Sequence, residues 1–263
     1  MFRHLRSEYS ARVATVTLNR PERRNAFSAE LMREMIACAQ ELAARDDVDA
    51  VIVTGAGAVF SAGADLKDSS RWAGGAPLLV QREIAGLGFR MARAWEELPQ
   101  MTIAAIEGYA VGGGLALAAA LDWRVIARDA FVSLPEIGLG IPLTWGTLPR
   151  LVNLVGPAKA KRLAILCERI GAEAAEAMGL VDEVCAKGLA VQQAQALAAA
   201  ALEKPRHAVR MTKESINAYA GIGAHAVSYM AHDQLELAAA SPESRAAREA
   251  AARGRSERRS PDQ

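Results

Sequence analysis

The chain has 263 residues, 51% of them hydrophobic, which is enough to bury the core of one large α/β domain, or of one domain with a small appendage. Its formal net charge is +1, so nothing in the charge indicates a nucleic acid or an anionic membrane surface as partner, and a small molecule is favoured. Widely spaced cysteines and an N-terminus without an apolar segment predict reduced thiols and a cytoplasmic protein.

The first part of the chain predicts strands that alternate with helices. Residues 12–19 alternate β-branched residues with small or polar ones, and residues 48–54 form a nearly continuous apolar run, so both are predicted strands. Between them, Ser28 is placed to cap a helix over residues 29–45. A single long helix is predicted over residues 79–98.

The last third of the chain is predicted to be mainly helical. Helices are expected over residues 157–167 and 172–178, the second of them ended by Gly179. A short strand is expected over residues 181–185. From residue 191 onward the sequence is helical in pattern and rich in alanine.

Residues 102–140, between these two parts, are the most informative stretch. They predict a strand, a glycine turn, a buried helix, a second strand and a loop. The run over residues 103–121 is apolar and almost long enough to span a bilayer. Glu107 and the triple glycine at 112–114 would interrupt a membrane helix, so we expect a buried strand and helix and no membrane span.

Two corners of small residues stand out, at residues 61–65 and 111–114. Each is predicted to follow a strand and to precede a helix. Small residues let a ligand approach the backbone, and the first N–H groups of a helix have no partner within it. Two such amides aimed at one oxygen would form an oxyanion hole, although the composition also fits two tight turns without a function.

Glu136 is the candidate acid or base. It follows Pro135 and precedes an apolar Ile-Gly-Leu run. A carboxyl group among apolar residues has a raised pKa, which suits proton transfer near neutral pH. An exposed loop glutamate is the alternative interpretation.

No motif in the sequence indicates a metal, a bound nucleotide or a catalytic nucleophile. The four histidines lack the spacing of metal ligands, so no metal site is predicted. The triple glycine at 112–114 has neither the phosphate-loop nor the dinucleotide-binding spacing.

Four segments taken together are more specific than any one of them: NRPERRNAFS, FSAGADLK, IAAIEGYAVGGGLALAAALD and SLPEIGLG. In this order they resemble the crotonase superfamily, the enoyl-CoA hydratase/isomerase family. The resemblance implies an α/β fold in which a crotonase-like spiral of ββα units forms two sheets, over residues 1–195. It also implies a C-terminal helical region, residues 196–263, used for trimerisation into a homotrimer or a dimer of trimers.

The resemblance further implies a substrate and a set of residues. The substrate is an acyl-CoA thioester, and no cofactor is expected beyond the coenzyme A of the substrate. The backbone amides of Ala64 and Gly113 match the pair that holds the thioester oxygen, and Glu136 matches the acid/base. The predicted residues for binding CoA or the acyl group are Arg24, Ala26, Ala62, Asp65, Leu66, Lys67, Gly112, Pro135, Leu143 and Trp145.

The sequence departs from the family pattern at three places. Ala116 stands where typical hydratases of the family have a second glutamate. Leu143 and Trp145 lie in place of the usual glycine-rich turn and are expected to narrow or reshape the acyl pocket. The C-terminal segment over residues 244–258 is alanine-rich, which puts its part in binding CoA in doubt.

Three functions follow from one carboxylate beside two amides. The simplest is a Δ3–Δ2 enoyl-CoA isomerase, because a lone base can move a proton between two carbons. The second is a hydratase or lyase that uses Glu136 with a partner that is not a carboxylate. The third is a non-catalytic acyl-CoA-binding protein.

Overall fold

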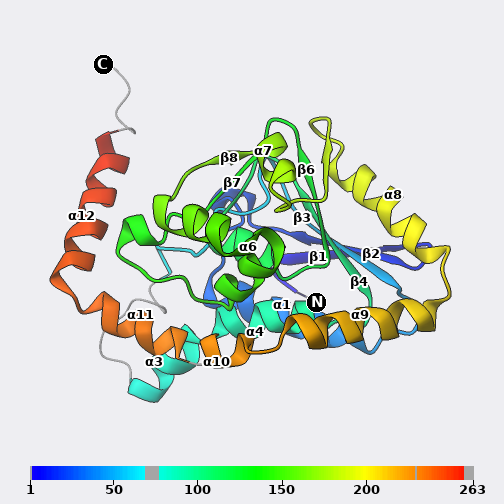
Figure 1. The fold of residues 1–263 in the computed structure, drawn as a ribbon, viewed down its shortest axis with the longest axis horizontal. Helices are drawn as coiled ribbons and strands as arrows, with labels where there is room; N and C mark the ends of the chain where they lie inside the picture. The colour runs from blue at the N-terminus through cyan, green and yellow to red at the C-terminus, as the bar shows by residue number, and fades with distance from the viewer. Residues whose placement is uncertain (1, 69–76, 229, 258–263) are drawn as a thin grey trace.

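The computed structural model describes residues 2–68, 77–228 and 230–257, and it shows an α/β fold with two sheets (Figure 1). In the larger sheet, the first two strands are antiparallel and the other neighbours are parallel. Its six strands lie in the order β1 (Leu5–Ser10), β2 (Val13–Leu18), β3 (Ala50–Gly55), β4 (Met101–Ile106), β6 (Trp123–Ala127) and β9 (Glu183–Cys185).

The smaller sheet consists of β5 (Tyr109–Val111), β7 (Phe131–Ser133) and β8 (Ile170–Gly171). β5 directly follows β4, and β7 directly follows β6, so successive pairs of strands give one strand to each sheet. The helix α5 (Gly113–Ala118) then follows β5. This succession of strand, strand and helix confirms the predicted two-sheet spiral.

Helices from separate parts of the chain pack together beside the larger sheet. The helix α1 (Ala29–Ala43) begins as predicted, since the Ser28 hydroxyl accepts a hydrogen bond from Leu31 N at 3.2 Å. It packs against α4 (Leu87–Glu96), where the fully buried Trp95 donates its indole N–H to the Met35 carbonyl at 3.1 Å. This contact joins α1 and α4 into one layer of the core.

The helix α8 (Ala190–Leu202) covers the other face of the larger sheet. Its Ala190, Ala194 and Ala198 are fully buried against β3, β4 and β6, because small side chains at helical spacing let the helix approach closely. Glu107 accepts hydrogen bonds at the start of this helix, from Gly188 N just before it and from Ala190 N, its first residue. Because α8 spans residues 190–202, the predicted domain boundary between residues 195 and 196 falls inside it. The division of the chain into a core and a C-terminal region stays a prediction.

The C-terminal helices run along one edge of the molecule (Figure 1). Buried Lys213 in α9 (Arg206–Ala220) holds that helix to the core, since its ammonium donates to Asp122 Oδ2 and to the Gln100 carbonyl, both at 2.6 Å. Beyond it lie α10 (Ala224–Ser228), α11 (Ala231–Ala239) and α12 (Pro242–Glu257).

Several elements differ from their predictions. Strand β1 was not predicted, and the helix expected over residues 79–98 is divided at Gly86 into α3 (Leu78–Ala85) and α4. The helix expected from residue 157 is the second part of α6 (Thr147–Leu166), which is kinked at Gly156. The remaining short helices are η1 (Pro21–Arg23), η2 (Ile137–Leu139) and α7 (Ala172–Ala177).

Two further predictions concern the helix expected after the corner at residues 61–65 and the absence of a membrane span. The corner at residues 61–65, which was predicted to precede a short helix, leads into a turn at 66–67, and residues 69–76 lie outside the described residues. Across the described parts of the chain, none of the helices has both the length and the apolar character that crossing a bilayer requires.

Candidate active site

The two predicted oxyanion donors come from loops that the fold ties together. Ala64 forms a parallel bridge with Phe27, in which Gly63 O accepts from Phe27 N at 2.8 Å and Asp65 N donates to Phe27 O at 3.0 Å. A second bridge joins Ser61 to the strand that precedes Gly113. In the described parts of the chain, neither Ala64 N nor Gly113 N donates a hydrogen bond to protein, so both remain available to a ligand.

The two donors are also close in space. A Cβ atom on Gly63 would lie 3.0 Å from Gly113 N, so the loop before Ala64 touches the donor in α5. Gly63 has a φ of +82°, a conformation that favours glycine. The absence of a side chain at Gly63 therefore permits the close approach of the two loops.

Gly112 lies between the amide of Gly113, which follows it in the chain, and the carboxylate of Glu136, which lies against its Cα. Its φ is +56°, and a Cβ atom there would lie only 2.7 Å from Glu136 Oε1. The Gly112 N–H donates a hydrogen bond to Ser133 O at 2.8 Å, which holds β5 beside β7. The triple glycine therefore gives the chain a turn, a free amide at Gly113, and room for the carboxylate of Glu136.

Glu136 lies at the start of η2 with its carboxylate directed inward. Its backbone carbonyl accepts from Leu139 N and Ile141 N, both at 2.9 Å, which fixes the turn. Its Oε2 is buried and has no hydrogen-bond partner within the described residues. Burial raises the pKa of the carboxyl group to about 7, against a smaller lowering effect of a backbone hydrogen bond.

A cavity of about 120 Å³ joins the carboxylate to the two amides. Glu136 is the only ionisable side chain among the described residues that line it, and Ala116, 2% exposed, lines it where a second carboxylate would have been. The lining consists of Ala62, Ala64, Leu66, Val111, Gly112, Gly113, Ala116, Pro135, Glu136, Leu139, Ile141, Pro142, Leu143, Thr144, Trp145, Thr147 and Leu235.

The structure brings most of the predicted residues together in this cavity. Arg24, Ala26, Asp65 and Lys67 do not line it. Sequence reasoning missed several lining residues, above all Thr144, Thr147 and Leu235. Leu235 comes from α11, near the end of the chain, and nothing in the sequence of that helix indicated that it reaches the site.

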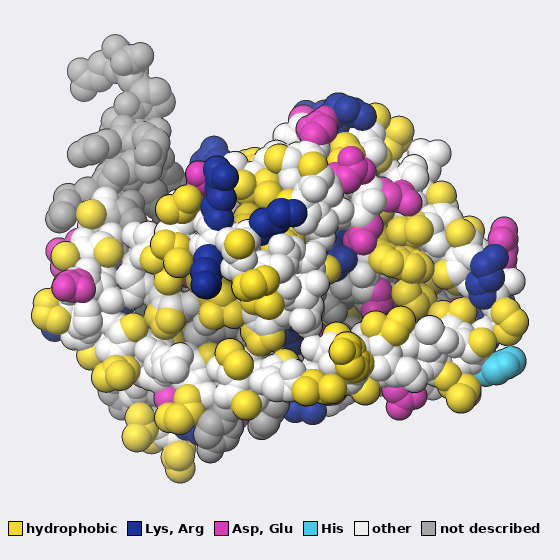
Figure 2. Space-filling model, viewed as in Figure 1, with side chains coloured by type: hydrophobic (Ala, Val, Ile, Leu, Met, Phe, Trp, Pro, Cys, Tyr) yellow, Lys and Arg dark blue, Asp and Glu magenta, His cyan; other side chains and the backbone are white. Residues whose placement is uncertain are grey.

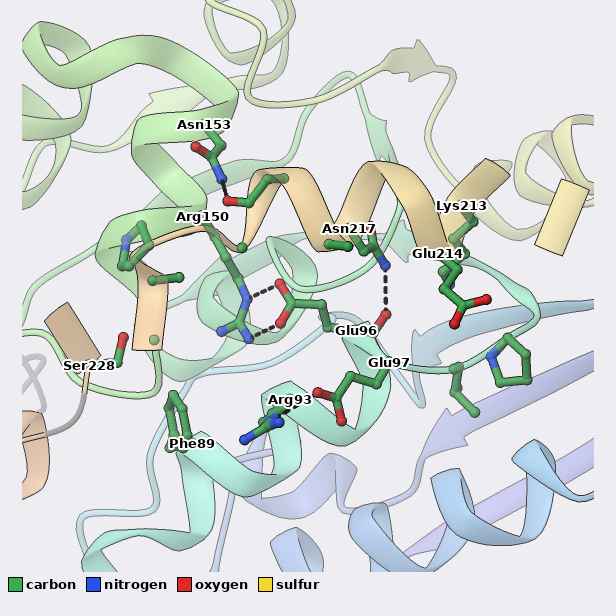
Figure 3. Close-up of a pocket in the computed structure, with 18 of the residues that line it drawn as sticks. Phe89, Arg93, Glu96, Glu97, Arg150, Asn153, Lys213, Glu214, Asn217 and Ser228 are labelled. Atoms are coloured by element: carbon green, nitrogen blue, oxygen red, sulfur yellow. Dashed lines mark hydrogen bonds and ion pairs between the residues drawn. The ribbon is translucent and has the colours of Figure 1, made fainter. Parts of the chain in front are cut away.

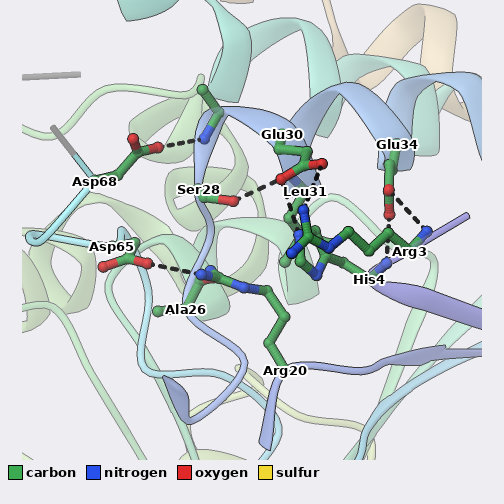
Figure 4. Close-up of polar contacts among 11 residues, drawn as sticks. Arg3, His4, Arg20, Ala26, Ser28, Glu30, Leu31, Glu34, Asp65 and Asp68 are labelled. Atoms are coloured by element: carbon green, nitrogen blue, oxygen red, sulfur yellow. Dashed lines mark hydrogen bonds and ion pairs between the residues drawn. The ribbon is translucent and has the colours of Figure 1, made fainter. Parts of the chain in front are cut away.

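The predicted CoA segments lie beside the cavity and are tied to each other (Figure 4). Arg20 pairs with Asp65 at 3.1 Å and donates to the Ala26 carbonyl, and Asp68 accepts from Ala29 N at 2.7 Å. Asp65 therefore joins the two loops. The basic side chains that line the adjoining depression, of about 360 Å³, are Arg20, Arg23, Arg33 and Lys67.

A larger cleft, of about 570 Å³, lies between α4, α6 and α9, and its lining includes neither Glu136 nor the two amides (Figure 3). Its polar groups bind one another: Arg150 forms two hydrogen bonds with Glu96, at 2.8 and 2.7 Å, and Asn217 donates to the Glu96 carbonyl. Asn153 likewise donates to the Ala220 carbonyl. The cleft therefore has the character of a structural joint between three helices.

Comparison with known proteins now adds to this geometry. The family model described as enoyl-CoA hydratase/isomerase matches residues 8–261. The chain belongs to this family. It is 40% identical over 206 residues to the putative enoyl-CoA hydratase/isomerase YngF of Bacillus subtilis, covering 78% of each chain. It is 35% identical over 211 residues to the short-chain-enoyl-CoA hydratase of Clostridium acetobutylicum, covering 80% of this chain and 79% of the relative.

A solved structure shows the same fold. The crystal structure of an enoyl-CoA hydratase/isomerase from Xanthobacter autotrophicus Py2 matches with a TM-score of 0.86 at 32% identity, covering 96% of this chain and 94% of that one. The crotonase-like fold and an enzyme of the enoyl-CoA hydratase/isomerase family are thereby confirmed, and the family acts on acyl-CoA thioesters.

Proposed function

We propose that this member of the enoyl-CoA hydratase/isomerase family is a Δ3–Δ2 enoyl-CoA isomerase. The observation that carries the proposal is that Glu136 is the only ionisable side chain among the described residues that line the cavity. The usual two-carboxylate hydration needs a second group to position water, and Ala116 cannot supply it. A proton shuttle between two carbons needs one group only.

The reaction moves one proton and one double bond. The ionised Glu136 takes a proton from C2 of a 3-enoyl thioester, and the electron pair of that bond forms a dienolate. The dienolate oxygen accepts hydrogen bonds from Ala64 N–H and Gly113 N–H, which stabilise the charge that develops there. Glu136, now protonated, returns the proton to C4, so the double bond ends between C2 and C3 and no atom is gained or lost.

The coenzyme A part of the substrate is assigned to the loops beside the cavity. Arg24 and Ala26 lie on one loop, and Asp65 and Lys67 lie on the other, which Arg20 holds in place. The adjoining depression is lined by the carboxylates Glu30, Asp65 and Asp68 as well as by four basic side chains, and the basic ones suit the phosphates of coenzyme A. No cofactor is needed by this chemistry, because the thioester itself carries the group that stabilises the dienolate.

A hydratase or lyase is the second candidate function, and one observation favours it. Thr144 lines the cavity, and its hydroxyl could hold a water near Glu136. The hydroxyl of Thr147, by contrast, donates to the Thr144 carbonyl at 2.6 Å and is already used. The relative from Clostridium acetobutylicum is named a hydratase, which agrees with this candidate.

The test is to follow the products formed from 3-enoyl-CoA and, separately, from 2-enoyl-CoA. Isomerisation without hydration is expected. As pH rises, kcat/KM should increase with an apparent pKa near 7, because the base acts when it is ionised. Glu136→Gln should lose at least about 100-fold in kcat, whereas the exposed control Glu176→Gln should not. Hydration that Thr144→Val abolishes would favour the second function, and binding without any turnover would favour the non-catalytic one.

We also propose that the protein is a cytoplasmic homotrimer, or a dimer of trimers, that associates through its C-terminal helices. α9 carries large apolar side chains that are well exposed in the isolated chain: Met211 at 65%, Ile216 at 61% and Tyr219 at 80%. Exposed apolar side chains along one helix support a contact with another chain.

A further inference from the structure

Two glycines make room for one indole ring in the wall of the cavity. A Cβ atom on Gly88, in α4, would overlap Trp145 at Cε2 and Nε1, and a Cβ atom on Gly113 would overlap it at Cζ3. The ring therefore lies against the backbone of both helices, directly beside the candidate oxyanion amide. Neither position could carry even an alanine without displacing the ring.

The indole is also fixed in its orientation. Trp145 has a φ of +61°, which is rare for a bulky residue and is maintained only where the surroundings enforce it. Arg150, held by Glu96 (Figure 3), donates to the Trp145 carbonyl at 2.7 Å. The Phe27 ring meets the indole edge to face, with centroids 5.8 Å apart. The φ angle and the Arg150 hydrogen bond fix the backbone that carries the indole, and rotation of the ring out of the cavity would break its contact with Phe27.

The space left beside this ring is small. The cavity holds about 120 Å³, less than the roughly 150 Å³ engineered cavity that accommodates benzene. The same volume must contain the carbon atoms that approach Glu136. Trp145 is 5% exposed and Leu143 is 9% exposed, so both are packed into the wall of the cavity.

We propose that Trp145 limits the acyl group to a short one, of fewer than about six carbons because the cavity is smaller than the one that accommodates benzene, and that Gly88 and Gly113 are the positions that admit this ring. The inference rests on the proposed acyl-CoA site, although not on which reaction occurs there. Trp145 is thus a specificity-determining residue. The acyl carbons beyond this length meet the indole instead of open space.

The test measures binding with saturated acyl-CoA thioesters, which cannot be isomerised or hydrated. Calorimetry on the purified protein should show butyryl-CoA binding at least about tenfold more tightly than decanoyl-CoA. Trp145→Ala should remove or reverse this preference, since each added methylene that becomes buried favours binding by about fourfold. Trp145→Phe is a smaller change that keeps a ring beside Phe27, and it serves as the test if the alanine variant fails to fold. It should shift the preferred length of the acyl chain upward.

Gly88 gives an independent test with a matched control. Gly88→Ala should press the indole into the cavity and weaken butyryl-CoA binding by at least about tenfold. Gly86→Ala is the control, because its Cβ would meet the flexible end of Arg90 first. In a Trp145→Phe or Trp145→Ala background, the effect of Gly88→Ala should largely vanish.

The outcomes separate this inference from the proposed function. Equal affinity of the unaltered protein for butyryl- and decanoyl-CoA would overturn it, as would an unchanged length preference in both Trp145 variants. Loss of turnover with the preference retained would overturn the proposed reaction alone. If no acyl-CoA binds at all, the proposed site and this inference fail together.

Discussion

Glu136 combines burial with the absence of a compensating charge. Its pKa is raised from 4.5 to about 7 in the folded protein, a difference that corresponds to about 3 kcal/mol. Between these two pH values the folded chain holds a proton that the unfolded chain has released. The free energy of unfolding therefore falls as pH rises from 4.5 to 7. Above pH 7 the full cost of keeping an ionised carboxylate buried is subtracted from the stability of the folded protein.

Glu136→Gln removes this penalty because the amide carries no charge. At pH 8 the variant should exceed the unaltered protein in free energy of unfolding by up to about 3 kcal/mol, and near pH 4.5 the two should be nearly equal. Urea denaturation at several pH values measures the difference. The control Glu176→Gln should show no such pH dependence, and a pH-independent effect of Glu136→Gln would contradict the assigned cause.

The candidate site residues could be assigned from the sequence, but the walls of the cavity could not. Glu136, Ala64 and Gly113 were assigned because four segments in order resemble one family, whereas glycine turns and a carboxyl among apolar residues alone also fit tight turns and an exposed loop glutamate. Their roles stay predictions. Thr144 and Leu235 could not be assigned, since a threonine in a loop and a leucine in a helix fit many environments. Their part in the cavity depends on tertiary packing.

At the scale of elements, the C-terminal helix α12 touches the turn that carries Glu136. α12 packs against η2, and a Cβ atom on Gly140, just after η2, would lie 2.6 Å from Ser244 Cα. Ser244 is buried there. The alanine-rich C-terminal segment, whose part in binding was in doubt, thus supports the backbone next to the candidate base.

Gly140→Ala should loosen this contact. The new Cβ would push α12 away from η2, so we expect reduced kcat and faster proteolysis of the C-terminal helices. Gly188→Ala is the matched control, because Gly188 also has a positive φ, of +80°, but nothing lies within 4 Å of a Cβ there. Equal effects of the two substitutions would indicate backbone strain alone, and not the contact with Ser244.

The elements that sequence reasoning missed are those with a weak pattern. Only Leu5 of the six residues of β1 is buried. A strand that is exposed in this way does not need apolar residues at alternate positions, and its sequence does not show them. The break between α3 and α4 lies at Gly86, whose φ of −76° and ψ of −11° remain helical. The helical periodicity could not reveal such a small irregularity.

At the scale of the whole molecule, apolar side chains are exposed over α9 and in a hollow beside it. Figure 2 shows hydrophobic side chains over α9 and in the hollow between α8 and α9. That hollow, of about 710 Å³, includes Leu197, Val209 and Ile216 in its lining. Exposed apolar area of this kind would be covered if the C-terminal helices associate with another copy of the chain.

Sedimentation at micromolar concentration should accordingly give a trimer or a multiple of it. Tyr219→Glu should shift the protein toward monomer, because a charge would be buried in the contact. Tyr9→Glu is the control, since Tyr9 is 47% exposed on β1, at the edge of the larger sheet. A monomer in the unaltered protein would contradict the predicted assembly.

The bridges that join Phe27 to Ala64 and Ser61 to Ala110 have a consequence for folding kinetics. The two amides belong to segments far apart in the chain, and contacts of high sequence separation form slowly because loop closure must precede them. Helical signal during refolding can therefore return before the amides meet. Regained acyl-CoA turnover would then report long-range assembly, and helix content measured by circular dichroism would run ahead of it.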